Sequence, residues 1–558
     1  MYLERIEIVG FRGINRLSLT LDENTVLIGE NAWGKSSLLD ALTLCLSPNT
    51  DLYHFEPQDF YFPPGDEAAK ERYLQIIFVF CESDVGHHNA PRYRPLSSLW
   101  QDGNDRFQRI YFRQEGELCD DGTVCTWRSF LDEKGEPLKL HHVDKLAREI
   151  VRLHPVLRLR DARFIRRLRP TVIAQNRVPD QSEVAQQLDD LTRELVRNPQ
   201  KLSNSELRQG LNAMQQLLEH YFAEQGQQLT NSRRRRHHSD EVHGGQAWRS
   251  LENMNQMIAE SGSRNMRLIL LGLFSTLLQA KGAITLDPHA RPLLLVEDPE
   301  TRLHPIMLSV AWGLLNQLPL QKITTTNSGE LLSLMPVERV CRLVRQSNKV
   351  ATYRIGPQGM SPEDSRRIAF HIRFNRASSL FARCWLLVEG ETEVWLLNEL
   401  ARQCGYHFET EGIKVIEFAQ CGIRPLVKFA RHMGLEWHVL VDGDDAGRKY
   451  AATVRALVEH ARDNERDRDR LTALPAPDME HYMYREGFAS VYHDIAGLPP
   501  NVPLSMRKVI TKAIHRSSKP DLAISVAAQA EAWGTDSVPA LIKGMFSRVL
   551  WLARGKAE

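Results

Sequence analysis

The run from Gly29 to Ser37, with the sequence GENAWGKSS, constrains the fold of this chain more than any other feature. It fits the pattern G-x-x-x-x-G-K-[ST], follows the apolar stretch 25–28 and precedes the apolar stretch 37–44, so it joins a predicted strand to a predicted helix. Its glycines allow several backbone N–H groups to face one phosphate, and the helix N-terminus adds a partial positive charge there. The run is therefore predicted to bind a nucleoside triphosphate; the alternative is a glycine-rich turn without a ligand.

The polar residues of this loop have predicted roles. Lys35 is expected to reach the β- and γ-phosphates of ATP, and Ser36 is expected to hold Mg²⁺. The complete predicted nucleotide site comprises Asn31, Gly34, Lys35, Ser36 and Ser37 from the loop and Asn327 from a later strand end.

Length and composition limit the remaining possibilities. A chain of 558 residues is too long for one hydrophobic core, which predicts roughly two to four domains. The net charge of +1 excludes a global field that attracts nucleic acid, so any nucleic-acid surface must be local. The eight cysteines form no C-x-x-C pair, which excludes a zinc ribbon and predicts reduced thiols in a cytoplasmic protein. The longest apolar run, 268–280, is too short to span a bilayer, so no membrane association is expected.

The phosphate-binding strand requires parallel neighbours, and these are predicted far along the chain. The run 291–300 reads as an apolar strand that ends in acidic residues. Such a strand end brings one carboxylate to Mg²⁺ and a second to the attacking water, and we assign these roles to Glu297 and Asp298. A solvated acidic turn is the alternative. A further predicted strand ends in the polar cluster 324–328, where Asn327 is placed to sense a γ-phosphate.

Together these segments resemble the ATPase heads of the ABC class, specifically the SMC-like branch. The resemblance is carried by Phe11-Arg12-Gly13 after the opening strand, by the phosphate loop, and by the run 296–305, which resembles a Walker B strand and a D-loop. The signature loop of that class is represented only by the run 260–263, and Asn327 stands where the class has a switch histidine. These two differences imply slower ATP turnover than in ordinary ABC proteins.

A segment rich in Leu, Gln, Arg and Glu, with helical spacing, separates the two halves of this head. We predict an N-terminal half over 1–142, a helical insertion over 143–262 that supplies homodimer contacts, and a C-terminal half over 263–375. Arginine clusters at 158–169 and 233–236 flank the insertion. They are interpreted either as solvated faces or as contacts to a nucleic-acid backbone.

A second group of acidic residues follows two apolar strands near the C-terminus. Glu389 comes directly after the stretch 384–388, Glu393 lies in the helix predicted next, and Asp442 and Asp444 follow the stretch 438–441. Parallel strands bring such ends to one edge of a sheet. Unpaired carboxylates there raise each other's pKa, and Mg²⁺ or Mn²⁺ relieves that repulsion, so all four are predicted metal ligands and catalytic residues. The charged run 462–470 is predicted to be a solvated loop.

This arrangement resembles the Toprim domain through Glu389-Gly390 and Asp442-Gly443-Asp444. Because an SMC-like head precedes it, the chain resembles one family in particular, the OLD (overcoming lysogenisation defect) ATP-dependent endonucleases. The resemblance implies an α/β fold with an ABC-type ATPase and its helical insertion, a Toprim domain over 380–495 and a C-terminal helical region over 496–558. It also implies catalytic roles for Glu480 and Lys519, for which the alternatives are a helix N-cap acid and a solvated loop lysine.

The predicted function is an ATP-regulated, divalent-metal-dependent DNA endonuclease or nickase. Two cations held by the four carboxylates would flank a phosphodiester, one activating water and the other stabilising the leaving oxygen, while Lys519 neutralises developing charge. A topoisomerase would need a tyrosine on a strand-passage domain and a primase would need a zinc ribbon, and the sequence indicates neither. The alternative left open is a non-catalytic, ATP-gated DNA-binding clamp with a vestigial Toprim domain. The sequence does not identify the DNA substrate or a helicase partner.

Overall fold

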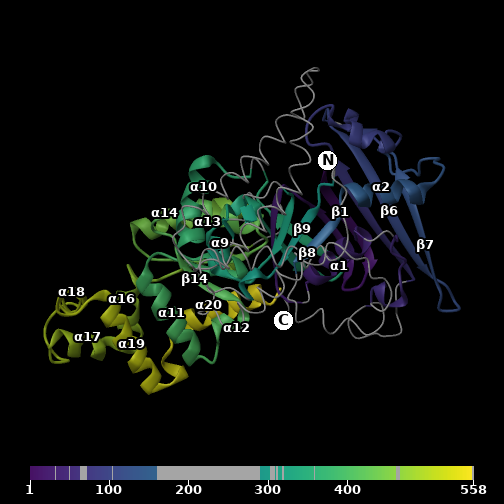
Figure 1. Cartoon of the computed structure of the whole chain (residues 1–558). Coiled ribbons are helices and arrows are strands. Elements are labelled where there is room, and N and C mark those ends of the chain that lie inside the picture. Colours follow the sequence, from purple (N-terminus) through teal and green to yellow (C-terminus); the bar gives the residue numbers. More distant parts are fainter. Residues whose placement is uncertain are drawn as a thin grey trace, which may run out of the picture. The chain divides into compact units, whose positions relative to one another are not determined.

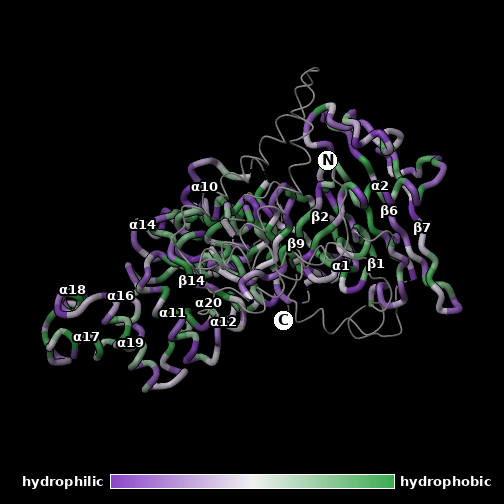
Figure 2. The backbone as a smooth tube through the Cα atoms, viewed as in Figure 1, coloured by the Kyte–Doolittle hydropathy of each residue, from purple (hydrophilic) through white to green (hydrophobic). Residues whose placement is uncertain are grey.

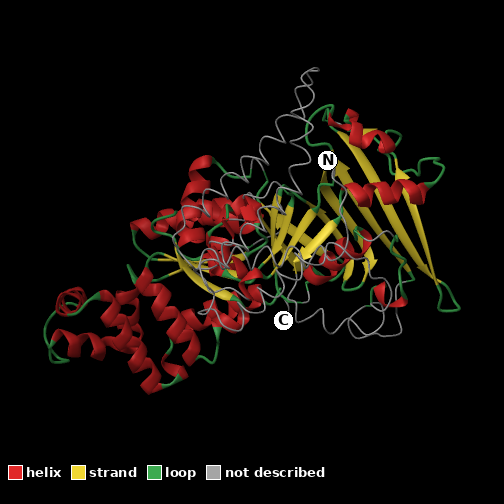
Figure 3. Cartoon of the chain, viewed as in Figure 1, coloured by secondary structure: helices red, strands yellow, loops and turns green. Residues whose placement is uncertain are grey.

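The computed structural model describes residues 1–31, 33–48, 51–62, 72–103, 105–159, 290–301, 320–356, 359–459 and 466–555, with short pieces between 308 and 316. Internal contacts divide the chain into two compact units, Met1–Leu334 with Arg339–Thr352, and Met335–Glu338 with Tyr353–Glu558. Helices and strands are mixed in both units, which confirms the predicted α/β class (Figure 3). No helix in the described ranges is long and apolar enough to cross a membrane.

The first unit is built on one twelve-stranded sheet with the order β5-β6-β4-β1-β2-β12-β11-β3-β10-β9-β8, in which β7 pairs with β6 off this path. One part is antiparallel and comprises β1 (Tyr2–Phe11), β2 (Ile14–Thr20), β4 (Tyr73–Cys81), β5 (Gln101–Asp102), β6 (Gln108–Leu118) and β7 (Val124–Leu131). The other part comprises β3 (Asn24–Ile28), β8 (Val156–Leu159), β9 (Leu293–Glu297), β10 (Lys322–Thr325), β11 (Val340–Arg345) and β12 (Val350–Arg354). Strand β3 is parallel to β10 and β11, β9 is parallel to β8 and β10, and β12 is parallel to β2. Strand β3 is buried at every residue, as expected for a parallel strand covered on both faces.

Helix α1 (Lys35–Cys45) starts directly at the phosphate loop and packs against this sheet. Its residues Leu38 and Leu42 are buried in the same core as Leu293 of β9 and Ile323 of β10. Figure 2 shows apolar residues concentrated along the strands of the large sheet. Because β10 lies between β3 and β9 and all three are parallel, their carboxyl ends meet at the loop that follows β3. Figure 1 shows β8 and β9 beside α1, the helix that follows this loop. The two halves of the head, far apart in sequence, therefore form one sheet.

The segment predicted as a helical insertion begins as part of the first unit. Residues Val143–Leu153 form α2, whose Ala147 and Ile150 enter the core of the first unit, and β8 then pairs with β9 as an edge strand. Residues 160–289 lie outside the described part of the chain. The rest of the predicted insertion, its homodimer contacts, the signature-like run 260–263 and the arginines beyond Arg158 therefore remain predictions.

The second unit is built on a four-stranded parallel sheet with the order β14-β13-β15-β16. Its strands are β13 (Cys384–Val388), β14 (Ile413–Glu417), β15 (Glu436–Val441) and β16 (Leu471–Ala473). Between successive strands lie α11 (Glu391–Gln403), α12 (Phe408–Glu411), α13 (Ile423–His432), α14 (Asp445–Glu459) and α15 (Asp467–Arg470). Strand β13 is completely buried, so the charged residues that follow it emerge at the sheet edge.

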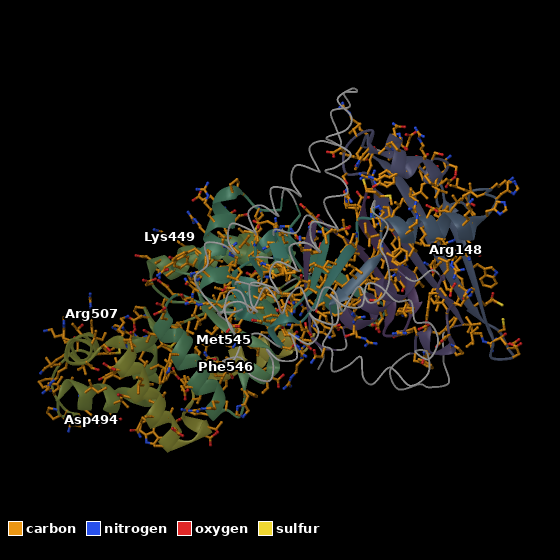
Figure 4. The ribbon with its side chains drawn as sticks, in the orientation of Figure 1. Arg148, Lys449, Asp494, Arg507, Met545 and Phe546 are labelled. Carbon is orange, nitrogen blue, oxygen red and sulfur yellow. The ribbon has the colours of Figure 1, made fainter. Side chains whose placement is uncertain are left out.

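A helical region follows the sheet, as predicted. It comprises α16 (Met479–Met483), the π-helical segment η8 (Tyr484–Phe488), α17 (Ala489–Ala496), α18 (Met506–Arg516), α19 (Lys519–Trp533) and α20 (Ala540–Ala553). Helix α20 returns to the sheet, where the ring of Phe546 meets that of Phe408 edge-on at 5.3 Å. Met545 and Phe546 are buried there, whereas Lys449 and Arg507 extend from the surface (Figure 4).

The second unit begins at Tyr353, earlier than the predicted domain start at residue 380. Helix α10 (Pro362–Ile368) packs against α13, and the π-helical segment η6 (Ala369–Phe374) continues it. His371 of η6 bonds through Nε2 to the backbone oxygen of Glu417 at 2.7 Å. The contacts of α10 with α13 and of His371 with Glu417 place these elements in the second unit.

Candidate active sites

The phosphate loop has the backbone that its glycines were predicted to allow. Gly34 precedes α1 with a φ of 94°, a left-handed conformation that L side chains rarely adopt. A Cβ on Gly29 would lie 2.8 Å from the backbone oxygen of Leu343 on β11, so this position also excludes a side chain. Sequence and packing therefore agree on the glycines at both ends of the loop.

Lys35 is buried at the start of α1 and turns back over the loop. Its Nζ donates to the backbone oxygens of Gly29 and Glu30, the latter at 3.4 Å. Burial lowers the pKa of Lys35, while Asp298 and Glu30 act in the opposite direction. The Lys35 ammonium thus lies close to the carboxylate predicted to position water. Ser36 is exposed next to it, and Ser37 Oγ accepts a bond from Gly13 N at 3.2 Å.

Asp298 is tied to the neighbouring strand β10. Its backbone N donates to Thr325 O at 3.1 Å, and Thr325 Oγ1 donates to Asp298 Oδ1 at 2.9 Å. Its φ of 40° is left-handed, which is strained for a non-glycine residue and recurs at functional sites. The strand end predicted from sequence therefore holds Asp298 in one orientation beside the phosphate loop.

Glu300 is a further acidic residue of this site to which sequence reasoning gave no role. It accepts bonds from Thr326 Oγ1 at 3.0 Å and from the backbone N of Asn327 at 2.6 Å, and its charge acts on Lys35. Its signal in the sequence was its place as the third acid of the run 297–300. Glu300 thus links the β9 end to Asn327, the predicted γ-phosphate sensor, whose side chain is exposed.

Arg158 of β8 binds Glu297, the residue that ends β9. Arg158 donates through Nε and Nη2 to the two carboxylate oxygens of Glu297, each at 3.0 Å, and through Nη1 to Asp40 at 2.6 Å. Asp40 also accepts from Arg12 at 2.5 Å. Both oxygens of Glu297 are therefore bonded to Arg158 in this structure, and the predicted metal role of Glu297 stays a prediction.

Arg158→Met is expected to lower the free energy of unfolding of the first unit by about 2–3 kcal/mol, because it leaves the carboxylate of Glu297 without its bidentate cation. Urea unfolding measures this loss. Adding Glu297→Gln should recover part of it by removing the uncompensated charge. Arg152→Met, which removes an exposed pair with Glu149, should cost no more than about 0.5 kcal/mol. Equal losses in the two single variants would contradict the assignment.

The second site lies at the carboxyl end of the parallel sheet. Strands β13 and β15 are direct neighbours, with Leu387 beside Val439, so Glu389 and Asp442 leave the sheet at the same edge. Glu393 lies in the first turn of α11 and accepts from Gly390 N at 3.0 Å. Asp444 caps α14 by accepting from Gly447 N at 2.7 Å. All four predicted carboxylates therefore come from neighbouring segments of one edge.

Two glycines make this edge possible. A Cβ on Gly443 would lie 2.4 Å from the backbone oxygen of Ala476, and one on Gly447 would lie 1.9 Å from that of Asp442. Neither clash can be relieved by a side-chain movement, because the opposing atoms are backbone. The glycines of the run 442–447 thus allow the two aspartates to sit against the chain that follows β16.

Like charges and burial perturb these carboxyl groups. Burial, Glu389 and Glu393 raise the pKa of Asp442 to about 8. Burial and Asp444 raise the pKa of Glu389, and burial and Glu480 raise the pKa of Glu393. The Oε2 atom of Glu389 is buried without a hydrogen-bond partner. The site therefore carries an excess of negative charge, which a cation would compensate.

Glu480 and Lys519 meet at this site. Lys519 Nζ lies 2.9 Å from Glu480 Oε1, and Glu480 is buried in the first turn of α16. Burial opposes the charge on Lys519, but Glu480 outweighs it and raises the lysine pKa. The helix N-cap proposed as an alternative for Glu480 is instead Asp478, and Lys519 begins α19 as a paired residue rather than a solvated loop lysine.

Asp478 and His481 are site residues that sequence reasoning did not single out. Asp478 raises the pKa of Asp442, so its charge acts within the carboxylate cluster. Its Oδ1 accepts from both the backbone N and the Nδ1 of His481 at 2.7 Å. The local sequence signal for Asp478 was its position two residues before Glu480 in the same short run.

The carboxylate groups at this edge of the sheet are suited to binding a hard divalent cation. Carboxylate oxygens are the ligands that Mg²⁺ and Mn²⁺ prefer, and the unpartnered oxygen of Glu389 is available as one. Within the described residues, no three histidine, cysteine or acidic side chains are already gathered closely enough to hold a metal ion. Mutual repulsion of the carboxylates is a physical reason for that separation.

The raised pKa of Asp442 predicts a pH-dependent effect of Asp442→Asn on the metal-free protein. A carboxyl that binds its proton more tightly when folded stabilises the folded state at low pH, and this advantage is lost as the pH rises through about 8. The variant should therefore be more stable than wild type at pH 9, by on the order of 1–2 kcal/mol after solvent screening, and this difference should shrink steadily as the pH falls toward the usual carboxyl pKa of 3.8. Thermal melts in EDTA measure this. The exposed Asp445→Asn is the control, and equal melting of wild type and Asp442→Asn at pH 9 would contradict the electrostatic assignment.

Comparison with known proteins matches two families to successive parts of the chain. Residues 1–379 match the family described as "Protein of unknown function (DUF2813)", and residues 380–444 match "Overcoming lysogenization defect protein-like, TOPRIM domain". The "Uncharacterized protein YbjD" of Escherichia coli (strain K12) is 65% identical over 100% of both chains.

Solved structures similar to this chain fall into two groups. The C-terminal region of the Burkholderia pseudomallei OLD protein is 20% identical, covering 31% of this chain and 99% of its own, with a TM-score of 0.27. The SMC head domain from Thermotoga maritima is 12% identical, covering 64% of this chain and 100% of its own, with a TM-score of 0.27. The sequence matches confirm the predicted relation to OLD proteins: the chain belongs to the DUF2813 family and carries an OLD-like Toprim domain over residues 380–444.

Proposed function

We propose that this protein is an ATP-regulated, divalent-metal-dependent DNA endonuclease or nickase. The observation that carries the proposal is the edge of the second sheet, where Glu389, Glu393, Asp442 and Asp444 emerge together and the Lys519–Glu480 ion pair adjoins them. An excess of carboxylates with one fixed cation is the arrangement that metal-assisted phosphodiester hydrolysis needs.

The four carboxylates would hold Mg²⁺ or Mn²⁺. When bound, such cations lower the pKa of water and stabilise a leaving oxygen. Lys519 then offsets negative charge that develops on the phosphate, and Glu480 keeps this lysine protonated and in place. Asp478 holds His481 by two hydrogen bonds beside the same cluster.

In the first unit, ATP is proposed to bind along the loop 29–37. Lys35 would exchange its bonds to Gly29 and Glu30 for the β- and γ-phosphates, because a charged acceptor binds an ammonium more strongly than a carbonyl does. Asp298 would orient water, and Asn327, held through its backbone by Glu300, would sense the γ-phosphate. The absence of a histidine at position 327 supports slow turnover.

The test uses the purified full-length chain and supercoiled plasmid with Mg²⁺, with Mn²⁺ and with EDTA, each with and without ATP. Nicked or linear product with a divalent cation and none in EDTA supports the proposal. The alternative is a non-catalytic, ATP-gated DNA-binding clamp with a vestigial Toprim domain. DNA binding that depends on ATP, with no product under any metal, would establish the clamp instead.

Homodimerisation is proposed because ABC-type heads complete their nucleotide sites across two copies. The contacts expected within 143–262 lie mostly outside the described residues. Multi-angle light scattering should give twice the chain mass of 63.9 kDa, at least with ATP present. A clean monomer with and without nucleotide would contradict this prediction.

A further inference from the structure

The helix formed by α10 and η6 presents two phenylalanines to solvent. Phe370 is 60% exposed and Phe374 58% exposed, the highest values of any aromatic residue in the described part of the chain. They follow Arg366 at four-residue intervals, and the guanidinium of Arg373 lies 4.3 Å from the ring centre of Phe374. We call Arg366, Phe370, Arg373 and Phe374 the aromatic face. Two adjacent exposed rings cost solvation free energy, which indicates a binding role.

Contacts with Glu417 attach the helix that carries the aromatic face to the edge of the second sheet where the candidate carboxylates lie. On the opposite side of the helix, His371 bonds to the backbone of Glu417, and Arg376 forms an ion pair with the Glu417 carboxylate. Glu417 ends β14 and is paired with Val388, the residue before Glu389. Arg376 also lies 3.7 Å from Glu391. Through these contacts, the helix that carries the rings is held at the end of β14, next to the strand end from which Glu389 emerges.

Further basic side chains lie on the neighbouring helix α13. Arg424 and Lys428 are exposed one turn apart on α13, the helix that packs against α10. Together with Arg366 and Arg373 they form no ion pair among the residues that the structure describes. The acidic residues of α10 are Glu363, which pairs with Arg367 at 2.5 Å, and Asp364 in the first turn. The aromatic face therefore keeps uncompensated positive charge.

We propose that the aromatic face stacks unpaired bases of a DNA strand and holds that strand beside the Toprim carboxylates. Every base has a π face, so aromatic rings flanked by arginines bind single strands with little sequence preference. Arg424 and Lys428 would contact the backbone phosphates of the same strand. A protein partner would be expected to match the rings with apolar side chains, and the uncompensated charge favours a polyanion instead. This inference rests on the proposed function, because it supplies the substrate contact of that site.

The test measures binding of a fluorescein-labelled single strand of ~20 thymidines by the full-length protein in EDTA, which prevents cleavage. Phe370→Leu with Phe374→Leu should weaken binding on the order of ten- to a hundredfold, because leucine keeps the apolar surface but cannot stack. Phe370→Tyr with Phe374→Tyr should restore most of the affinity. Trp127→Leu, a 47% exposed aromatic on β7, is the matched control and should bind like wild type.

Two readouts separate the possible failures. If the leucine pair binds the single strand like wild type, the inference is wrong, even where plasmid cleavage upholds the proposed function. If wild type binds the strand through these rings but never cleaves, the proposed function fails and the stacking face stands. If the leucine pair instead changes the mass measured by light scattering with DNA affinity unchanged, the face is a contact between copies and the inference is overturned. Thermal melts confirm that both pairs are folded.

Discussion

Asp444→Asn is expected to remove metal-dependent DNA cleavage, lowering its rate at least about a hundredfold, while ATP hydrolysis stays near the wild-type rate. Asparagine keeps an Oδ1 acceptor for Gly447 N, so the cap of α14 survives. The substitution removes one negative charge from the proposed cation ligands, and each such ligand offsets the cost of dehydrating the cation. Plasmid relaxation with Mn²⁺ and phosphate release from ATP, measured on one preparation, test both halves of this prediction.

Asp445→Asn is the matched control for this experiment. Its side chain is 89% exposed and pairs with Arg448, one position beyond Asp444, so cleavage should continue. DNA binding by Asp444→Asn should persist and weaken steeply with salt, because backbone contacts release counterions. If Asp444→Asn cut plasmid as fast as wild type, the Toprim edge would not be the nuclease centre. If it lost ATP hydrolysis as well, the two chemistries would not be independent.

Lys35→Ala should reduce ATP hydrolysis at least about a hundredfold, from a wild-type rate that is itself slow. The Lys35 ammonium is held in the phosphate loop, and its loss removes the charge placed to bind the β- and γ-phosphates. It also leaves the nearby carboxylates of Asp298 and Glu300 without this cation. Phosphate release and nucleotide binding should be measured together, since a loss of both distinguishes failed binding from slowed chemistry.

Lys349→Ala, at an exposed position, is the control and should hydrolyse ATP like wild type. Metal-dependent plasmid cleavage by Lys35→Ala then reports how ATP regulates the second site. Rapid ATP hydrolysis by Lys35→Ala would exclude the loop 29–37 as the nucleotide site.

The local backbone of both candidate sites could be predicted from the sequence because each depends on short-range requirements. Glycine at position 34 is needed for a left-handed turn before α1, and glycines at 443 and 447 are needed where the backbone passes close to itself. Apolar runs followed by acids predicted the ends of β9, β13 and β15 within a few residues. Each pattern lies within a short stretch of sequence, so the two strand-loop-helix motifs could be predicted without knowledge of the tertiary structure.

Some predictions were wrong because distant residues decided the outcome. The run 462–470 was predicted to be a solvated loop, but its last residue, Arg470, is buried against Trp437 and bonds to the Trp437 oxygen at 2.9 Å. The segment after 143 was assigned to an insertion, but β8 pairs with β9 at the edge of the twelve-stranded sheet. A charged or helical sequence pattern predicts solvent exposure only on average. A single contact with a residue on a neighbouring strand is enough to bury part of such a segment.

The sequence alone thus determined the two kinds of site, a phosphate loop and a carboxylate edge, through residue types at fixed local spacing. The tertiary structure alone decided how these residues are partnered: Arg158 on Glu297, Glu300 on Asn327, and Lys519 on Glu480. The physical reason is that an ion pair between segments far apart in the chain leaves no periodicity or spacing in either one. Its energy depends on the distance and burial of the two groups, which exist only once the strands are paired and the helices packed.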